Sequence, residues 1–374
     1  MKKLLICSDS FLPRWDGVAR FLSELIPRIK DEYEIRVLVP RFPGELDSIY
    51  GVTIVRLPLS KLKAADYVFS RPRIGKIRAE VAWADIVWTH TIGPIGATAI
   101  LTAHAMKKRL LAYIHSVEWE LFSKSLSKNY LRGIVYTGTK ALARVLYNKC
   151  TLLMIPTLEF ADQLKANKIK APAKPVFLGV DTNKFVPPLS KPRAKVRIGL
   201  DGQAKVVGYC GRIGREKDLL TLYRGFMRAR RQIPGVKLVV VGAGVKDLDK
   251  LFRDKTDVLY FGTQDHVIPY IQAMDVSVLP SLTETTSLST LEAMSCEVPV
   301  IVTKVGQVKD YVREGKNGLF FPQKDPYELS KKIIGLLNDE KARYNMGRAA
   351  RATVVEMYSF EKTLKDIREI LAVF

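Results

Sequence analysis

Short apolar runs alternate with longer amphipathic segments along the chain, and this alternation constrains the fold more than any other feature of the sequence. Runs of strand length separated by segments of helix length predict strands joined by crossover helices, and therefore parallel sheets. The expected strands are residues 3–8, 35–39, 86–89, 110–114 and 152–155 in the first half, and 204–208, 237–241, 258–261, 276–279 and 298–302 in the second. Residues 18–29 and 95–106 are expected helices. Because 374 residues exceed the size at which one core stops growing, we expect two doubly wound α/β domains.

A proline-rich stretch marks the expected boundary between the two domains. Residues 186–192, with the sequence VPPLSKP, combine three prolines with polar residues, a composition typical of an extended connector. We therefore predict an N-terminal domain over residues 1–185, a linker over 186–195 and a C-terminal domain over 196–356. Residues 357–374 form a further expected helix, whose destination the periodicity does not give.

The formal net charge of +22 is concentrated in one region. Residues 51–150 hold 16 Lys and Arg against 5 Asp and Glu, a net of +11. Such a region attracts polyanions, which include nucleic acids, anionic lipid surfaces and phosphorylated substrates. Within it, cations alternate with apolar residues: Lys124, Lys128, Arg132, Lys140 and Arg144 with Phe122, Leu126, Leu131, Val135 and Leu142. This pattern favours contact with an anionic membrane surface, and a solvated basic helix face is the alternative.

The sequence also carries expectations about compartment and metals. No apolar run has the length of a membrane span, and the first apolar stretch, MKKLLIC, is too short for a secretory signal. The four cysteines are far apart and form no C-x-x-C pair, so neither zinc nor a disulfide framework is indicated. Asp247 and Asp249 have D-x-D spacing but follow a lysine in an expected helix. We expect a cytoplasmic protein with buried free thiols and no metal site.

Two glutamates in the second half are the main candidates for chemistry. Glu284 follows the expected strand 276–279, and Glu292 lies on the helix that comes next. Ligands of open α/β sheets bind beyond the carboxyl ends of the strands, and the amides at the start of that helix, at Thr286, Ser287 and Leu288, would face a bound anion. A helix cap and a solvated helix position are the simpler interpretation of two isolated glutamates, but the segment around them is mostly apolar.

A glycine-rich loop follows the first strand of the second half. Residues 206–218 read VVGYCGRIGREKD, which is a strand, then Gly211, then Arg212 and Lys217 ahead of a helix. Glycines let the backbone approach a ligand closely, and Arg and Lys neutralise a diphosphate. A tight turn with solvated cations would look the same without the neighbouring carboxylates.

The first half offers two candidates at strand ends. Gly17 lies between the first expected strand and the first helix, where its backbone N–H could approach a phosphate oxygen; the alternative is a helix capped by Asp16. His115 ends the strand 110–114 and is the one histidine that we place in a cleft. His90 ends its own strand in the same way.

Together these segments resemble family 4 of the retaining glycosyltransferases, and the resemblance covers nearly the whole chain. It rests on Glu284 to Glu292 continuing into PVI at 299–301, and on GR at 211–212 with EK at 216–217. GVDTNKF at 179–185 and NGLF at 317–320 also match. The resemblance implies two Rossmann-like domains facing a cleft, with the final helix packing back on the N-terminal domain.

The resemblance also implies roles for single residues. Glu292 would bind the donor ribose and Glu284 the transferred sugar, while Arg212 and Lys217 would hold the diphosphate. Gly17 would lie near the distal phosphate, His115 near the sugar or the acceptor, and Thr263 and Gln264 in the loop that receives the base. The donor would be a nucleoside-diphosphate sugar, UDP-linked in preference to GDP-linked, with no cofactor or metal required. Thr285 and Ser287 stand where the family often has glycine, and this leaves the donor open.

The implied activity is a retaining hexosyl transfer. The residues TET at 283–285 and 13–18 look most like members that glycosylate membrane lipids, so we expect a diacylglycerol- or phosphoinositol-type acceptor and a peripheral position on the inner face of the cell membrane. A soluble sugar or polysaccharide acceptor is the alternative. A non-catalytic nucleotide- or nucleic-acid-binding module is a further one, which only the basic charge favours.

Overall fold

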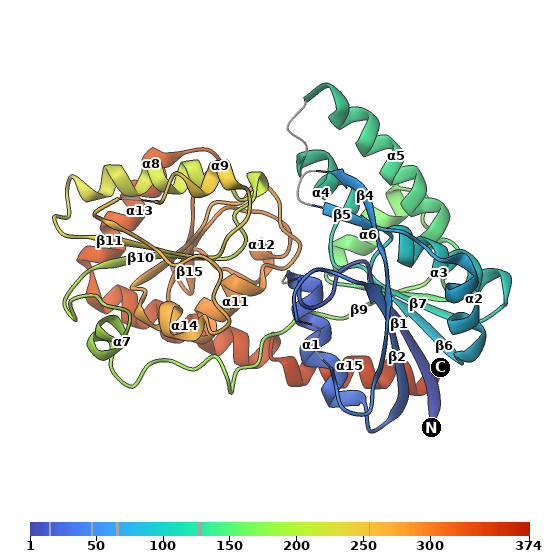
Figure 1. Cartoon of the computed structure of the whole chain (residues 1–374). Coiled ribbons are helices and arrows are strands. Elements are labelled where there is room, and N and C mark those ends of the chain that lie inside the picture. The colour runs from blue at the N-terminus through green and yellow to red at the C-terminus, as the bar shows by residue number, and fades with distance from the viewer. Residues whose placement is uncertain (15, 46–47, 65–66, 126–128, 254) are drawn as a thin grey trace. The chain divides into compact units, whose positions relative to one another are not determined.

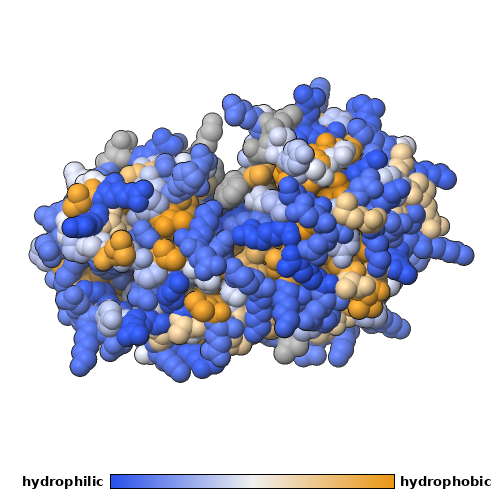
Figure 2. Space-filling model, turned by 90° about the horizontal axis from the view of Figure 1, so that it is seen from below, coloured by the Kyte–Doolittle hydropathy of each residue, from blue (hydrophilic) through white to orange (hydrophobic). Residues whose placement is uncertain are grey.

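The computed structural model describes residues 1–14, 16–45, 48–64, 67–125, 129–253 and 255–374. The chain forms two compact units, one of Met1–Phe177 with Asp366–Phe374 and one of Leu178–Lys365 (Figure 1). Each unit is described below by itself. Among the described residues, the helices are too short or too polar to cross a membrane. The face shown in Figure 2 is mostly hydrophilic, with hydrophobic residues in small separate groups.

The first unit is built on a parallel sheet of seven strands in the order β3-β2-β1-β6-β7-β8-β9. Its strands are β1 Lys2–Cys7, β2 Tyr33–Pro40, β3 Thr53–Leu57, β6 Ile86–Thr89, β7 Arg109–Tyr113, β8 Leu152–Ile155 and β9 Ala173–Pro175. Two further strands, β4 Leu59–Ala64 and β5 Tyr67–Ser70, pair separately and antiparallel. The helices are α1 Gly17–Ile29, α2 Ile74–Trp83, α3 Pro94–Ala105, α4 Glu118–Ser125, α5 Asn129–Tyr147 and α6 Leu158–Ala166.

The second unit contains a parallel sheet of six strands in the order β12-β11-β10-β13-β14-β15. Its strands are β10 Val206–Cys210, β11 Lys237–Val241, β12 Val258–Tyr260, β13 Val276–Leu279, β14 Val300–Val302 and β15 Gly318–Phe320. The helices are α7 Lys191–Arg197, α8 Leu219–Arg230, α9 Lys246–Asp249, α10 Ile268–Ala273, α11 Leu288–Ser295, α12 Val308–Tyr311, α13 Pro326–Asn338 and α14 Glu340–Met357. The last helix, α15 Phe360–Val373, begins in this unit and ends in the first.

The strands are buried on both sides, as the apolar runs predict. All four residues of β6 and of β13 are buried, and Leu4, Leu5, Ile6 and Cys7 of β1 expose none of their surface. Strands covered by helices on both faces need continuous apolar runs, which is what the sequence shows. The predicted α/β class with two Rossmann-like units is therefore confirmed.

The boundary region differs from the prediction. The chain enters the second unit at Leu178, because the Val180 amide donates to the Tyr358 carbonyl (2.9 Å) and the Phe360 amide to the Val180 carbonyl (2.9 Å). Within residues 186–192, which were expected to be extended, the chain becomes helical from Lys191, where Ser190 caps helix α7 by accepting from the Arg193 amide. Proline in the first turn of a helix costs no hydrogen bond, so the prolines did not exclude a helix there.

The free thiols are mostly buried, as predicted. Cys7, Cys150 and Cys296 are buried and Cys210 is partly exposed. Burial raises the pKa of the Cys150 and Cys296 thiols to about 12. These two side chains therefore stay protonated at neutral pH and serve as small apolar residues of the core.

Candidate functional site

The two loops that carry the predicted donor-site residues flank the point where the strand order of the second sheet reverses. β10 and β13 are neighbours, and the chain runs outward from them in opposite directions, to β11 and β12 on one side and to β14 and β15 on the other. Loops that leave two such strands diverge and leave a crevice, which is where open α/β sheets bind ligands. The glycine-rich loop follows β10 and the Glu284 segment follows β13.

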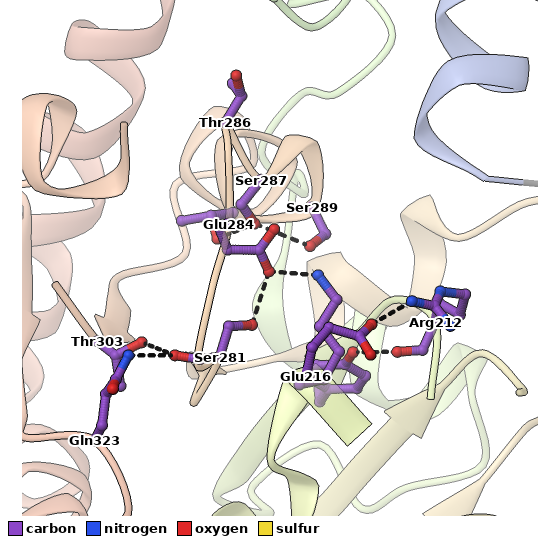
Figure 3. Close-up of polar contacts among 12 residues, drawn as sticks. Arg212, Glu216, Ser281, Glu284, Thr286, Ser287, Ser289, Thr303 and Gln323 are labelled. Atoms are coloured by element: carbon purple, nitrogen blue, oxygen red, sulfur yellow. Dashed lines mark hydrogen bonds and ion pairs between the residues drawn. The ribbon is translucent and has the colours of Figure 1, made fainter. Parts of the chain in front are cut away.

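Glu284 forms an ion pair with Lys217 at this point. Lys217 Nζ contacts Glu284 Oε1, and Ser281 Oγ donates to the same oxygen at 2.7 Å (Figure 3). The Glu284 side chain is 10% exposed and that of Lys217 is 19% exposed. Glu284 is therefore held in one orientation beyond the end of β13, by groups from two different loops.

Arg212 is held in the same way by Glu216, a residue that the sequence analysis did not assign. The guanidinium contacts Glu216 Oε1, and the Glu216 carboxylate is 3% exposed against 24% for Arg212 (Figure 3). The Leu282 amide donates to the Glu216 carbonyl at 2.8 Å, which joins the two loops through their backbones. Glu216 therefore orients the Arg212 side chain and fixes the distance between the loop after β10 and the loop after β13. The sequence does offer a sign of this role, because Glu216 lies four residues after Arg212, a spacing at which opposite charges can pair.

The segment that precedes Glu284 is held by the loops after β14 and β15. Thr303 Oγ1 and Gln323 Nε2 both donate to the Ser281 carbonyl, at 2.6 Å and 3.4 Å (Figure 3). Gln323 Nε2 also donates to the Leu282 carbonyl at 3.0 Å. Gly306 has φ +49°, and a Cβ there would lie 2.0 Å from the Glu284 carbonyl oxygen. Only glycine fits this position, because any side chain would displace the backbone that carries Glu284.

The helix after Glu284 presents a backbone N-terminus. Ser287 precedes α11 with φ 60°, and among the described residues no side chain caps this helix end. The Ser287 hydroxyl lies 2.8 Å from that of Thr290, and Tyr311 Oη donates to the Thr286 carbonyl at 2.7 Å. Ser287 therefore adopts the left-handed conformation, which glycine takes without strain and other residues rarely adopt. The first amides of α11 are available to an anion.

Glu292 lies inside α11 and is 1% exposed. It is on the same helix whose N-terminus follows Glu284, so one rigid element connects the two glutamates. The predicted solvated helix position is therefore excluded for Glu292. Its predicted contact with the donor ribose stays a prediction.

The predicted base loop is locked by its own glutamine. Gln264 Nε2 donates to the Phe261 carbonyl at 2.8 Å and Tyr270 Oη donates to Gln264 Oε1 at 3.0 Å. Both ends of the Gln264 amide are thus used inside the unit, so this side chain shapes the loop, and the backbone around Thr263 is what remains for a ligand. A cavity of about 530 Å³ adjoins the loop, with Arg197 among its lining residues.

In the first unit, the residue before Gly17 caps the helix. Asp16 Oδ1 accepts from the Val18 and Ala19 amides, both at 3.0 Å, and Ser10 Oγ donates to Asp16 Oδ2. The alternative interpretation of this segment, a cap by Asp16, is what the structure shows. Space around Gly17 is open, and its predicted approach to a phosphate stays a prediction.

His115 follows β7 and lies against a second histidine. His115 Nε2 is 2.9 Å from Nδ1 of His90, which follows β6. His90 is 1% exposed and His115 partly exposed. Burial lowers the pKa of His115 to about 3 and that of His90 well below its usual range, with the neighbouring His115 as the second cause for His90. Both rings are therefore neutral at physiological pH.

The described residues hold no cluster of three or more His, Cys, Asp or Glu side chains placed to bind a metal ion. Asp249 is 5% exposed on α9, with Arg253 at 3.9 Å, and Asp247 on the same helix is exposed. The interpretation of this D-x-D as a surface feature therefore holds for Asp247, whereas Asp249 is buried.

Two family models match the two halves of the chain. The model described as Glycosyltransferase Family 4 matches residues 15–184, and the one described as Glycosyl transferases group 1 matches residues 190–353. The chain belongs to glycosyltransferase family 4. The resemblance found in its motifs is thereby confirmed, and the chain is a glycosyltransferase of the family 4 type.

Two curated relatives of this family 4 chain act on lipids, according to their names. The GDP-mannose-dependent alpha-(1-6)-phosphatidylinositol monomannoside mannosyltransferase of Mycolicibacterium smegmatis is 26% identical over 397 aligned residues, covering 99% of this chain and 98% of the relative. The alpha-monoglucosyldiacylglycerol synthase of Acholeplasma laidlawii is 26% identical over 357 residues, covering 88% and 86%. Among solved structures, that of Anabaena Alr3699/HepE in complex with UDP-glucose has a TM-score of 0.78 at 16% identity and covers both chains fully. This likeness shows that the two share a fold.

Proposed function

We propose that this glycosyltransferase moves a hexose, with retention of anomeric configuration, from a nucleoside-diphosphate sugar to a hydroxyl of a diacylglycerol- or phosphoinositol-type membrane lipid. The nucleoside-diphosphate sugar is inferred as the donor from one cluster of charged side chains beside the N-terminus of α11. This cluster consists of Lys217, Glu284, Arg212 and Glu216. A departing nucleoside diphosphate accumulates negative charge, and fixed cations and amides stabilise that charge without having to reorganise.

The ion pairs define what each residue does in this proposal. Arg212 and Lys217 neutralise the diphosphate, with the amides of Ser287 and Leu288 as additional donors of hydrogen bonds. The Gly211 amide already donates to the Val241 carbonyl at 2.9 Å, so Gly211 serves by letting the backbone approach the ligand closely. Glu216 and Ser281 are positioning residues, because each holds a side chain that faces the ligand. Glu284 would accept from hydroxyls of the sugar while Lys217 and Ser281 hold its carboxylate in place, and Glu292 would bind the ribose.

The donor is a UDP-sugar in preference to a GDP-sugar. HepE, whose fold this chain shares, is solved with UDP-glucose, whereas the mycobacterial relative uses GDP-mannose. Incubating the purified protein with a panel of both nucleotide-sugar classes and a lipid extract, and measuring released nucleoside diphosphate and labelled lipid, tests donor and acceptor together. Label in a water-soluble product instead of in lipid would contradict the lipid acceptor.

Glu284→Gln and Glu292→Gln separate the two glutamates. In the proposal, Glu292→Gln weakens binding of the nucleoside diphosphate, and Glu284→Gln lowers turnover while the donor still binds. Calorimetric titration and initial rates measure the two effects. An unchanged rate in Glu284→Gln would contradict the role of this carboxylate.

The membrane lipid is inferred as the acceptor from a stripe of apolar side chains that α5 exposes to solvent. Tyr130 and Ile134 are each 71% exposed, Val145 is 51% and Leu142 is 46% exposed. Positions 130, 134, 142 and 145 lie on one side of a helix of 3.6 residues per turn, with Lys140 and Arg144 along its edge. Apolar side chains flanked by cations fit the interface of an anionic bilayer.

The apolar residues on this stripe differ from most of those that the sequence analysis named. Phe122, Leu131 and Val135 are only partly exposed, whereas Leu142 is on the stripe. Leu126 and Lys128 lie outside the described residues. The pattern of alternating cations falls on α4 and α5, and which of its residues are exposed depends on how these two helices pack together.

Vesicle binding tests this surface. Each basic residue near an anionic surface contributes about 1 kcal/mol, so we expect binding to anionic vesicles that weakens as salt rises. Ile134→Ser should lower this binding, and Leu189→Ser, which changes a fully exposed leucine in the second unit, is the matched control. Equal binding to neutral vesicles in high salt would contradict the electrostatic docking.

A further inference from the structure

His90 and His115 lie side by side because their strands do. β6 and β7 are parallel neighbours, with Thr89 opposite Ala112, so the residues that follow them leave the sheet at the same edge. The 2.9 Å between His90 Nδ1 and His115 Nε2 is a hydrogen bond, and one of these two nitrogens must carry the proton. The resemblance to family 4 implies a role for His115 and none for His90.

Aromatic rings enclose the pair and keep it neutral. The Trp88 ring centroid is 4.5 Å from that of His90, the Tyr113 ring is stacked 4.5 Å from His115, and Phe21 of α1 is 5.2 Å from His115. Such surroundings disfavour an imidazolium, so each ring carries a single proton. Two arrangements then remain. Either His90 donates from Nδ1, or His115 donates from Nε2.

The far nitrogen of His90 distinguishes these two arrangements. His90 Nε2 is buried, and no hydrogen-bond partner exists for it in the part of the chain that the structure describes. If His115 were the donor, the one proton of His90 would sit on this Nε2, as a buried N–H with no acceptor. In proteins, a buried N–H donor without a partner is rarer than a buried acceptor without one. The arrangement with a bare Nε2 and a proton on Nδ1 is therefore favoured.

We propose that His90 is a positioning residue that donates from Nδ1 to His115 Nε2 and thereby places the single proton of His115 on Nδ1. His115 then faces a bound substrate as a hydrogen-bond donor to an oxygen atom, and cannot act there as a base. The tautomer follows from contacts within the first unit alone. The identity of the substrate oxygen rests on the proposed function.

Nitrogen NMR on protein labelled with ¹⁵N-histidine tests the tautomer directly. The chain has four histidines, so long-range proton–nitrogen spectra contain four rings, and single substitutions assign them. We expect both His90 and His115 to show a protonated Nδ1 and a bare Nε2. A protonated Nε2 on His115, or signals averaged between tautomers, would overturn the proposal, whatever the activity of the enzyme.

Two variants of His90 then test the positioning role. The side-chain amide of His90→Asn can still donate near the position of Nδ1, whereas His90→Leu fills part of the space and donates nothing. We expect the Leu variant to release His115 into a mixture of tautomers and to lower kcat roughly tenfold, with donor binding little changed. The Asn variant should keep the wild-type His115 signals and most of the rate.

Two readouts keep these variants interpretable. His104→Gln changes an exposed histidine of the same unit and should move neither the His115 signals nor the rate. The tryptophan fluorescence of each variant reports whether the first unit is folded, since all four tryptophans precede residue 120. An unchanged His115 tautomer in a folded His90→Leu variant would refute the positioning role. If no donor supports turnover, the proposed function fails, and the spectra still decide the tautomer.

Discussion

Replacing Glu118 by glutamine should stabilise the first unit at alkaline pH. Glu118 is the first residue of α4 and is 6% exposed. Tyr147 Oη, at the end of α5, donates to its Oε1, and among the described residues its Oε2 is buried without a hydrogen-bond partner. Burial raises the pKa of the Glu118 carboxyl from 4.5 to about 7, although the Tyr147 hydrogen bond opposes this rise.

The size and sign of the effect follow from proton linkage. The folded state holds the Glu118 proton more tightly than the unfolded state, so this group lowers stability as pH rises from 4.5 through about 7. At about 1.4 kcal/mol per pH unit, the full effect above pH 7 amounts to about 3 kcal/mol. Glutamine has the same shape and no charge, so Glu118→Gln should remove this loss, and its advantage over the wild type should vanish below pH 4.5.

Denaturant unfolding followed by tryptophan fluorescence measures this difference. All four tryptophans precede residue 120, so the signal reports the first unit and leaves the second one silent. Glu120→Gln removes a charge from the same turn of α4 and is the matched control. A Glu118→Gln variant that is less stable than the wild type at pH 8, or a difference that is the same at pH 4 and pH 8, would refute the reasoning.

Three further predictions concern the second unit. Arg351→Met removes hydrogen bonds to the carbonyls of Phe185 (2.9 Å), Ser295 and Thr182, and should destabilise this unit by about 3 kcal/mol. Circular dichroism should show this loss, while the unfolding transition followed by tryptophan fluorescence, which reports the first unit, should not change. Gly306→Ala should lower turnover, because the new Cβ displaces the Glu284 backbone. Gly315 has φ +72° but open space around it, so Gly315→Ala should cost only about 1 kcal/mol of stability and leave the rate intact. Gln264→Leu removes the two hydrogen bonds that fix the base loop, and should weaken nucleoside diphosphate binding roughly fivefold by calorimetry. Gln272→Leu, on α10, removes one amide hydrogen bond away from this loop and should leave the binding unchanged.

The sequence by itself was enough for the fold class and the family. Buried parallel strands need unbroken apolar runs, so ten of the strands could be located to within a few residues from the positions of apolar residues along the chain. Expected strand 204–208 appears as β10 Val206–Cys210, and expected helix 18–29 as α1 Gly17–Ile29. Glu284, Arg212 and Lys217 could be proposed as site residues because each stands in a segment that follows a strand, at the edge where a parallel sheet binds its ligands.

The partners of these residues were decided only by the tertiary structure. Lys217 and Glu284 are 67 positions apart, and they meet because β10 and β13 are neighbours in a strand order that local patterns do not encode. The same holds for His90 and His115, which are joined by a hydrogen bond because β6 and β7 are neighbours. The domain boundary also depended on a distant contact, that of Val180 with Tyr358 and Phe360. Apolar periodicity records whether a residue is buried, whereas strand order determines which distant residue it is buried against.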